Sequence, residues 1–200
     1  AANEYTNAST TALVGADSKD WDDALIAMLG LPRDIFQSIK TAGTVLGHLT
    51  PEMQAKVGFD AEVILPATHD TGSAFLAVPA RDEFAAYLSS GTWSLLGVEN
   101  AAAITSADSC VANFTNEGGY EYRYRYLKNI MGLWMIQSVR RELGEQNGTR
   151  PSFPELIAAA KEVADFASCV DPNDSRFLAP TSMIAEVKAA CAATHQPMPQ

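Results

Sequence analysis

The sequence has 200 residues, 47% of them hydrophobic and 19% charged, which excludes a disordered or fibrous chain. Fourteen basic residues against 24 acidic ones give a net charge of −10, and no segment gathers basic residues, so we expect no nucleic-acid partner. The apolar runs fall short of the roughly 18 residues of a spanning helix, and the first residues lack a signal pattern. We therefore expect a cytoplasmic chain without membrane contact.

The cysteine and histidine spacing indicates no protein-bound metal. The three cysteines, Cys110, Cys169 and Cys191, are widely spaced and lie in neither a CxxC nor a Cys/His ligand pattern. His48 and His195 likewise lack partners at ligand spacing. We expect the three cysteines to be buried or chemically indifferent thiols.

The first third of the chain predicts alternating strands and helices. The opening residues do not resemble a natural start, and residues 10–15 (TTALVG) are strand-like. Asp20 is placed to cap an amphipathic helix that ends at Gly30. Residues 61–65 (AEVIL) predict a short buried strand, after which residues 73–78 are helix-like.

The middle of the chain predicts antiparallel strands. Residues 84–89 and 93–98 flank the small-residue turn Ser90-Gly91-Thr92, as in a β-hairpin. A second pair is predicted at 112–115 and 120–126, with Gly118-Gly119 as its turn.

The last third of the sequence predicts helices. A helical pattern begins at Asn129, and residues 144–151 are expected to form a loop. Two further helices are predicted at 153–163 and 181–194, joined through the turn-rich segment 171–174.

Asp70 is the first candidate for chemistry, because it follows a predicted strand in a polar loop with His69 and Thr71. Ligands of α/β sheets bind beyond the carboxyl ends of strands. A carboxylate there can accept the proton of a substrate hydroxyl, as phosphoryl transfer to an alcohol requires. The alternatives are a helix N-cap for Asp70 and an ordinary hydrogen-bonded loop histidine for His69.

Three further residues are candidates for ligand binding. The hairpin tip at Gly91 and Thr92 offers backbone N–H groups and a hydroxyl that can hold phosphate oxygens, although such turns are also common structural features. Asn129 and Gln137 would lie on one side of a helix that begins at Asn129, which suits a shared ligand. Asn129 could instead be the N-cap of that helix.

The order of several motifs carries a family resemblance. The succession is His69-Asp70-Thr71, then residues 87–94 (YLSSGTWS), 116–119 (NEGG) and 128–134 (KNIMGLW), with 6–11 (TNASTT) before and 171–174 (DPND) after. Together they resemble the FGGY carbohydrate kinases, and within that family its rhamnulokinase branch. The resemblance covers nearly the whole chain.

The resemblance implies an α/β, ribonuclease H-like, actin-type ATPase fold. It places residues 1–77 at the end of the first FGGY kinase domain and residues 78–200 at the start of the second. The family's amino-terminal phosphate loop and its late glycine-rich adenosine segment have no counterpart here. We therefore expect a fragment that is inactive alone and that self-associates through surfaces exposed by truncation.

The resemblance also implies residue roles. Asp70 matches the catalytic base, and His69, Thr71 and Asn129 match sugar-binding positions, with Asp70 also touching the sugar. Thr92 and Gln137 match positions that contact ATP, which binds with Mg²⁺.

The implied reaction is phosphorylation of L-rhamnulose at its 1-hydroxyl, in rhamnose catabolism. The alternatives are a kinase for another ketose, such as fuculose, xylulose or ribulose, and a non-catalytic sugar-binding fragment.

Overall fold

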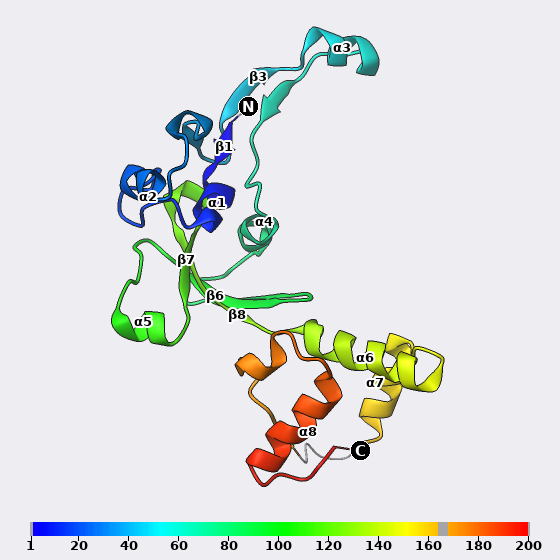
Figure 1. Cartoon of the computed structure of the whole chain (residues 1–200). Coiled ribbons are helices and arrows are strands. Elements are labelled where there is room, and N and C mark those ends of the chain that lie inside the picture. Colours follow the sequence, from blue (N-terminus) through cyan, green and yellow to red (C-terminus); the bar gives the residue numbers. More distant parts are fainter. Residues whose placement is uncertain (1, 164–167, 200) are drawn as a thin grey trace. The chain divides into compact units, whose positions relative to one another are not determined.

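The computed structural model describes residues 2–163 and 168–199 (Figure 1). It divides into two compact units, and β8 passes from one to the other. Unit 1 contains the chain up to Ser89 together with Leu95–Lys128, and unit 2 contains Ser90–Ser94 together with the residues from Asn129 onward. These contact-based units divide the chain differently from the sequence-based division after residue 77, which stays a prediction.

Strands and helices alternate in the first part of the chain. In order they are β1 (Asn3–Glu4), α1 (Tyr5–Ala8), η1 (Ser9–Thr11), α2 (Asp23–Met28), η2 (Arg33–Ile35), β2 (Ile39–Lys40), β3 (Val45–His48), α3 (Pro51–Val57), β4 (Glu62–Ile64) and α4 (Asp70–Ala77). The remaining elements are β5 (Ala86–Ser90), β6 (Ser94–Asn100), α5 (Ala107–Val111), β7 (Thr115–Gly118), η3 (Tyr120–Tyr122), β8 (Tyr124–Ile130), α6 (Leu133–Asn147), α7 (Phe153–Lys161), η4 (Ser175–Phe177) and α8 (Met183–Ala193).

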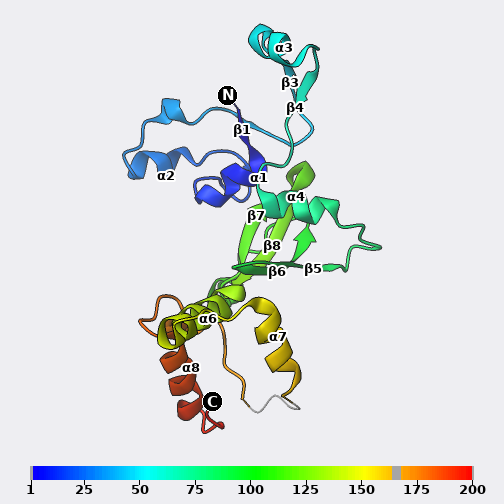
Figure 2. The ribbon, with the colours of Figure 1, turned by 90° about the vertical axis from the view of Figure 1, so that its right-hand side faces the viewer.

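The largest sheet has four strands in the order β5-β6-β8-β7. β7 pairs with β8 in antiparallel register, with Gly118 opposite Tyr124, so the predicted antiparallel pair is confirmed here. α4 lies against this sheet, as two views show (Figures 1 and 2), and Phe75 stacks on Tyr87 of β5 with ring centroids 4.5 Å apart. The sheet therefore supports the helix that begins at Asp70.

Two small sheets complete unit 1. β1 pairs with β2 in parallel, and β3 pairs with β4 in antiparallel orientation. The unit's hydrophobic cluster contains Ala8, Trp21 and Ile26, with neighbours from the loops around them. Trp21 also donates from its indole nitrogen to the Gln37 carbonyl at 2.7 Å, which satisfies its polar group inside the cluster.

Unit 2 is helical and has its own hydrophobic cluster. Met131, Phe177, Met183 and Ala190 form its buried centre, and Trp134 packs against it from α6. α7 begins with a capping box in which Ser152 and Glu155 exchange hydrogen bonds. The predicted helices at 153–163 and 181–194 are confirmed as α7 and α8, each slightly shorter than expected.

Several sequence predictions in unit 1 are wrong in detail. Asp22, and not Asp20, caps α2, because its carboxylate accepts from the backbone N–H groups of Ala24 and Leu25. The strand expected at 61–65 is β4, which pairs only with β3 and leaves Ile64 57% exposed instead of buried.

Three other segments differ from the expected elements. Residues 10–15 form no strand, since η1 occupies the first of them and Ala12 adopts a left-handed conformation. The strand expected at 112–115 starts only at Thr115, because α5 ends with its C-cap at Ala112 and Asn113 adopts a left-handed conformation, and η3 delays β8 until Tyr124. The loop expected at 144–151 starts only at Gly148, whose φ of 73° ends α6.

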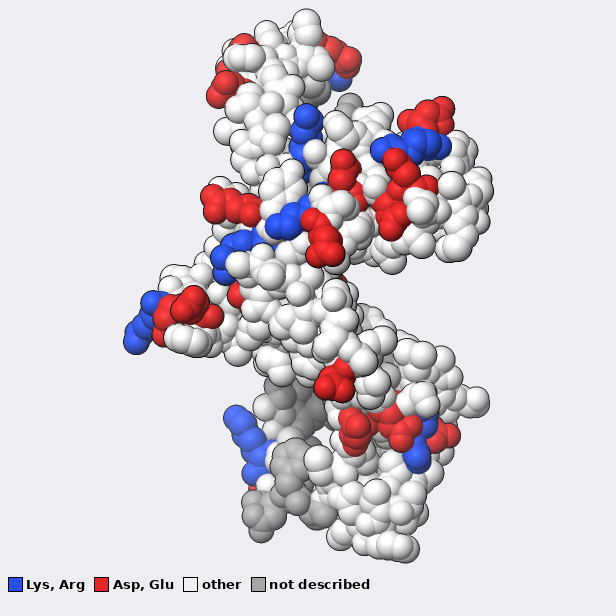
Figure 3. All heavy atoms as spheres, turned by 90° about the vertical axis from the view of Figure 1, so that its left-hand side faces the viewer, with Lys and Arg blue, Asp and Glu red and all other residues white. Residues whose placement is uncertain are grey.

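The distribution of charged side chains and the hydropathy of the helices agree with what the composition indicated. On the face drawn in Figure 3, basic side chains are dispersed among acidic ones. Within residues 2–163 and 168–199, the helices are too short or too polar to cross a membrane.

Candidate functional site

The candidate catalytic residue stands at the start of α4. His69 precedes this helix in an extended conformation, and Asp70 is its first residue. Asp70 Oδ1 accepts from the Thr71 backbone N–H at 2.6 Å and from the Thr71 hydroxyl at 3.3 Å. The Asp70 side chain is 98% exposed, so the carboxylate remains accessible to a ligand. His69 occupies the N-cap position of α4, so the N-cap alternative for Asp70 is wrong.

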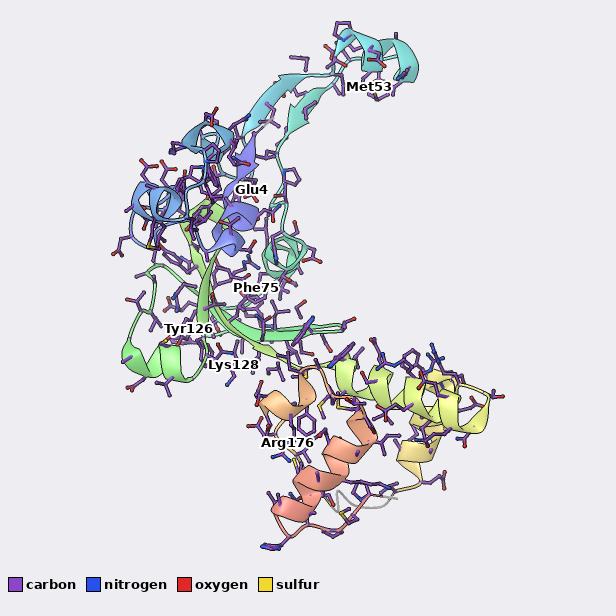
Figure 4. All side chains as sticks on the ribbon, viewed as in Figure 1. Glu4, Met53, Phe75, Tyr126, Lys128 and Arg176 are labelled. Carbon is purple, nitrogen blue, oxygen red and sulfur yellow. The ribbon has the colours of Figure 1, made fainter. Side chains whose placement is uncertain are left out.

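A buried carboxylate fixes the loop before Asp70. Glu4 is 3% exposed, and its Oε2 accepts from both the backbone N–H and the hydroxyl of Thr68 at 3.0 Å. Figure 4 shows Glu4 next to α1, where Oε2 also accepts from the Thr6 N–H at 3.0 Å. The Thr6 hydroxyl in turn accepts from the His69 N–H at 3.2 Å. These bonds tie residues 68–69 to the start of the chain.

Gly72 allows α4 to approach the same segment. A Cβ at Gly72 would lie 3.2 Å from Thr6 Cβ, which is tighter than nine in ten real contacts of this kind. A side chain at this position would require Thr6 to give by a few tenths of an ångström.

A buried arginine lies behind His69. Arg125 on β8 is 1% exposed, and its Nη1 lies 3.3 Å from His69 Nδ1. Its Nε donates to the Gly118 carbonyl at 3.0 Å, and its Nη2 pairs with Glu117 at 3.1 Å. Burial, the largest influence, lowers the pKa of Arg125 below its usual value, while the charges of Glu117, Glu4 and Asp70 oppose that shift.

The hairpin tip in unit 2 is bonded to the start of α6. The Leu133 N–H donates to the Gly91 carbonyl at 3.1 Å, and the Trp134 N–H donates to the Thr92 carbonyl at 3.0 Å. A Cβ at Gly132 would lie 2.3 Å from Ser94 Oγ, so only glycine fits this junction. Thr92 itself is exposed, which leaves its hydroxyl accessible.

Asn129 and Gln137 do not share a helix. β8 continues to Ile130 and α6 begins only at Leu133, so Asn129 is an exposed strand residue and not a helix N-cap. β8 pairs with β7 over Tyr124–Leu127 and stays extended beyond this pairing as far as Ile130, so sheet formation takes precedence over the helical pattern. Gln137 lies half-buried in α6, and the expectation that one helix presents both amides is wrong.

The sequence reasoning missed Glu4 and Arg125. Glu4 stands in a polar opening run without a motif, and Arg125 alternates with tyrosines in the segment YRYRY, where a charged side chain normally faces solvent. Arg125 lies in β8, whereas Arg123 precedes the strand as the C-cap of η3, and the tyrosine–arginine alternation carries no signal that separates them. Sequence alone does not say which of them is covered.

Comparison with known families decides the assignment of the chain. The C-terminal domain of the FGGY family of carbohydrate kinases matches residues 86–199, and its N-terminal domain matches residues 1–77. The chain belongs to the FGGY family of carbohydrate kinases. This confirms the family resemblance carried by the motifs around Asp70, Thr92 and Asn129.

Curated relatives of this FGGY chain are rhamnulokinases. The protein from Oceanobacillus iheyensis is 52% identical over 198 residues, which is 99% of this chain and 41% of that protein. The protein from Halalkalibacterium halodurans is 54% identical over 199 residues, covering 100% of this chain and 41% of its own length. The resemblance to rhamnulokinases is therefore confirmed, and the chain spans less than half the length of these relatives.

Solved structures of other FGGY kinases share the fold. A xylulose kinase from Lactobacillus acidophilus superposes with a TM-score of 0.64 at 17% identity, covering 81% of this chain and 32% of that one. A gluconate kinase from the same species has a TM-score of 0.62, again at 17% identity and with the same coverage. At such low identity the likeness concerns the fold alone, and it confirms the expected actin-type ATPase architecture of this FGGY chain.

Proposed function

We propose that this FGGY chain is part of a kinase that transfers the γ-phosphoryl group of MgATP to the 1-hydroxyl of L-rhamnulose. The observation that carries the proposal is the 52% identity to a rhamnulokinase across 99% of the chain. Exposure of the Asp70 carboxylate at the start of α4 agrees with it, because the base must reach a substrate hydroxyl. The products would be L-rhamnulose 1-phosphate and ADP.

The proposed step requires one proton acceptor from this chain. Asp70 takes the hydroxyl proton while the hydroxyl oxygen bonds to the γ-phosphorus, and the bond from that phosphorus to the β,γ-bridging oxygen breaks to release ADP. Such transfers depend mainly on positioning and on charge stabilisation. The hydrogen bonds from Thr71 to Asp70 Oδ1 orient the carboxylate, which leaves Oδ2 as the oxygen that faces the sugar in this proposal.

The other roles follow the family pattern residue by residue. His69, Thr71 and Asn129 are proposed to contact the sugar, and Thr92 and Gln137 are proposed to contact ATP. The accessible Thr92 hydroxyl and the exposed Asn129 suit these roles, since both side chains are open to ligands.

Two alternatives remain in view. A kinase for fuculose, xylulose or ribulose would share the same base and the same ATP contacts, since the fold is common to kinases named for other substrates. A non-catalytic sugar-binding fragment would retain the sugar contacts without turnover. This second reading follows from the expectation that the phosphate loop and the adenosine segment lie outside the chain.

A coupled ADP-release assay tests the proposal. The 200-residue chain and a version extended by its native flanking sequence are each supplied with MgATP and L-rhamnulose, L-fuculose, D-xylulose or D-ribulose. We expect ADP release only in the extended version, and fastest with L-rhamnulose. Faster ADP release with another ketose would make that ketose the proposed substrate in place of L-rhamnulose. Sugar binding by a folded extended version without turnover would favour the binding fragment.

A further inference from the structure

Arg125 makes three interactions that together fix its guanidinium. The side chain is 1% exposed, so it is shielded from solvent on all sides. Nε donates to the Gly118 carbonyl at 3.0 Å, and Nη1 lies 3.3 Å from His69 Nδ1. Nη2 forms an ion pair with Glu117 Oε2 at 3.1 Å that lacks hydrogen-bond geometry. Glu117 is itself 13% exposed at its side chain, which makes this a largely buried ion pair. The guanidinium fork therefore has little freedom to turn away from His69.

The contact with Arg125 determines which nitrogen of His69 carries the proton. A guanidinium has only donors and is not deprotonated in proteins, so His69 Nδ1 must accept in this contact. A neutral imidazole that accepts at Nδ1 carries its proton on Nε2. His69 is 24% exposed at its side chain, so Nε2–H is able to donate to a ligand oxygen.

The same contact affects Asp70. His69 Nδ1 lies 3.8 Å from Asp70 Oδ1, so a proton on Nδ1 would draw the carboxylate into an ion pair or hydrogen bond with the ring. With Nδ1 directed at Arg125 as an acceptor, the ring offers Asp70 no proton. The carboxylate then keeps its capacity to accept a proton from a substrate.

From this geometry we infer that Arg125 is a positioning residue for sugar phosphorylation, acting through His69. It holds His69 as the Nε2–H donor for a sugar oxygen and keeps Nδ1 from engaging the Asp70 carboxylate. This inference rests on the proposed kinase function, and it adds a residue that lies behind the sugar-binding loop and does not touch the sugar. Glu117 and the Gly118 carbonyl contribute indirectly, because they hold Arg125 in place.

Nitrogen NMR of the 200-residue chain tests the tautomer without any activity. The chain has three histidines, and the His69 signals are assigned as those lost in His69→Gln. We expect Nε2–H and unprotonated Nδ1 in the wild type near pH 7.5. The double variant Arg125→Met with Glu117→Gln removes both buried charges together, which avoids leaving one unpaired. It should gain Nδ1–H signal, because Asp70 then attracts that proton.

Two NMR results would overturn the inference. They are an Nδ1–H tautomer in the wild type, or an unchanged tautomer in a folded double variant. If the double variant does not fold, the Arg125→Lys spectrum takes its place. A gain of Nδ1–H signal in Arg125→Lys relative to the wild type supports the inference, and an unchanged tautomer overturns it.

Kinetics in the extended protein tests the consequence. Arg125→Lys keeps the charge, but one ammonium cannot reach Gly118, Glu117 and His69 as the fork does. We expect kcat/KM for the sugar to fall on the order of 10- to 100-fold, with KM for ATP unchanged. In a His69→Gln background, Arg125→Lys should lower kcat/KM for the sugar only slightly, since Arg125 acts through His69. An equal loss in both backgrounds would indicate a merely structural role.

Arg123→Lys is the matched control. Arg123 lies directly before β8 and pairs with Glu99 at 2.5 Å, but its side chain is 40% exposed. Its kcat/KM should stay within about twofold of wild type. If the extended protein phosphorylates no sugar, the proposed function fails, while the NMR measurement still decides whether Arg125 sets the His69 tautomer.

Discussion

At the level of single residues, Asp70 combines a structural and a chemical role. Its Oδ1 accepts from the Thr71 N–H in the first turn of α4, while the N-cap position itself belongs to His69. Its 98% exposure meets the requirement for a base that reaches a substrate. The hydrogen bond to Thr71 and the proposed role as base are compatible, because the two oxygens of one carboxylate can serve different partners.

Asp70→Asn separates these two roles. Asparagine keeps a side-chain oxygen that accepts from the Thr71 N–H, so the midpoint of thermal unfolding should stay near the wild-type value. Proton acceptance is lost, and kcat of the extended protein should fall by about 10²- to 10⁴-fold. Initial rates with saturating L-rhamnulose measure the loss. Wild-type turnover in a correctly folded Asn variant would remove Asp70 from the role of base.

The sequence was informative about residues in loops and much less so about buried polar ones. His69, Asp70 and Thr71 were found because three polar residues follow a predicted strand. Arg125 and Glu4 were not, because their importance comes from burial, and burial depends on which segments the fold brings together. The contact between Arg125 and His69 joins residues 56 positions apart, and no local pattern encodes it.

At the level of elements, the junction of β8 and α6 shows where periodicity misleads. Residues 129–131 fit a helical pattern, yet β8, which lies between β6 and β7 in the sheet, stays extended through Ile130. Gly132 then makes the turn, with φ −68° and ψ −114°, and its lack of a Cβ lets it approach Ser94. A single-sequence pattern placed α6 correctly but missed its first residue, because tertiary contacts define that end.

A carboxylate from α6 caps α8. Glu142 is 8% exposed and accepts from the Ser182 hydroxyl at 2.7 Å and from the backbone N–H groups of Met183 and Ile184. Burial alone would raise its pKa, but these hydrogen bonds and the charge of Arg141 outweigh burial, so the pKa of Glu142 lies below its usual value. The carboxylate thus links two helices of unit 2.

Glu142→Gln tests this cap through pH. A lowered folded-state pKa means that the ionised group stabilises the fold at pH values above its unfolded pKa of about 4.3, and that this contribution disappears as pH falls through the folded value. We expect Gln to lower the free energy of unfolding by about 1–3 kcal/mol at pH 7 and to flatten the loss of stability below pH 5. Urea titrations followed by Trp134 fluorescence measure both quantities.

Glu145→Gln on the same helix is the control for Glu142→Gln. Glu145 is exposed, so its replacement should change stability by no more than about 0.5 kcal/mol. If the free energy of unfolding depended on pH in the same way in the wild type and in Glu142→Gln, the cap would not depend on the charge of Glu142.

At the scale of the whole chain, the family assignment was accessible from the sequence and the division into units was not. The motif order spans the chain and identifies the family without any contact information. The units depend on which side chains pack together, so Ser90–Ser94 joins unit 2 although its neighbours in sequence belong to unit 1.

Self-association of the chain stays a prediction. Large apolar side chains are exposed in both units, Phe84 and Leu178 among them. Sedimentation velocity at rising protein concentration should show species heavier than the monomer, because association covers apolar surface. A single monomer boundary at all concentrations, with a cooperative thermal transition, would contradict it.

The two hydrophobic clusters predict that the units unfold separately. Phe177 is 0% exposed in the cluster of unit 2, and Ile26 is 1% exposed in that of unit 1. Replacing either by alanine should cost about 2–5 kcal/mol, and the loss should fall on its own unit. Trp21 reports on unit 1 and Trp134 on unit 2, so variants in which Trp93 and one of these two tryptophans are replaced resolve the two transitions. Phe177→Ala should shift only the Trp134 transition, and Ile26→Ala only the Trp21 transition. Equal shifts of both reporters in either variant would show that the chain unfolds as one cooperative body.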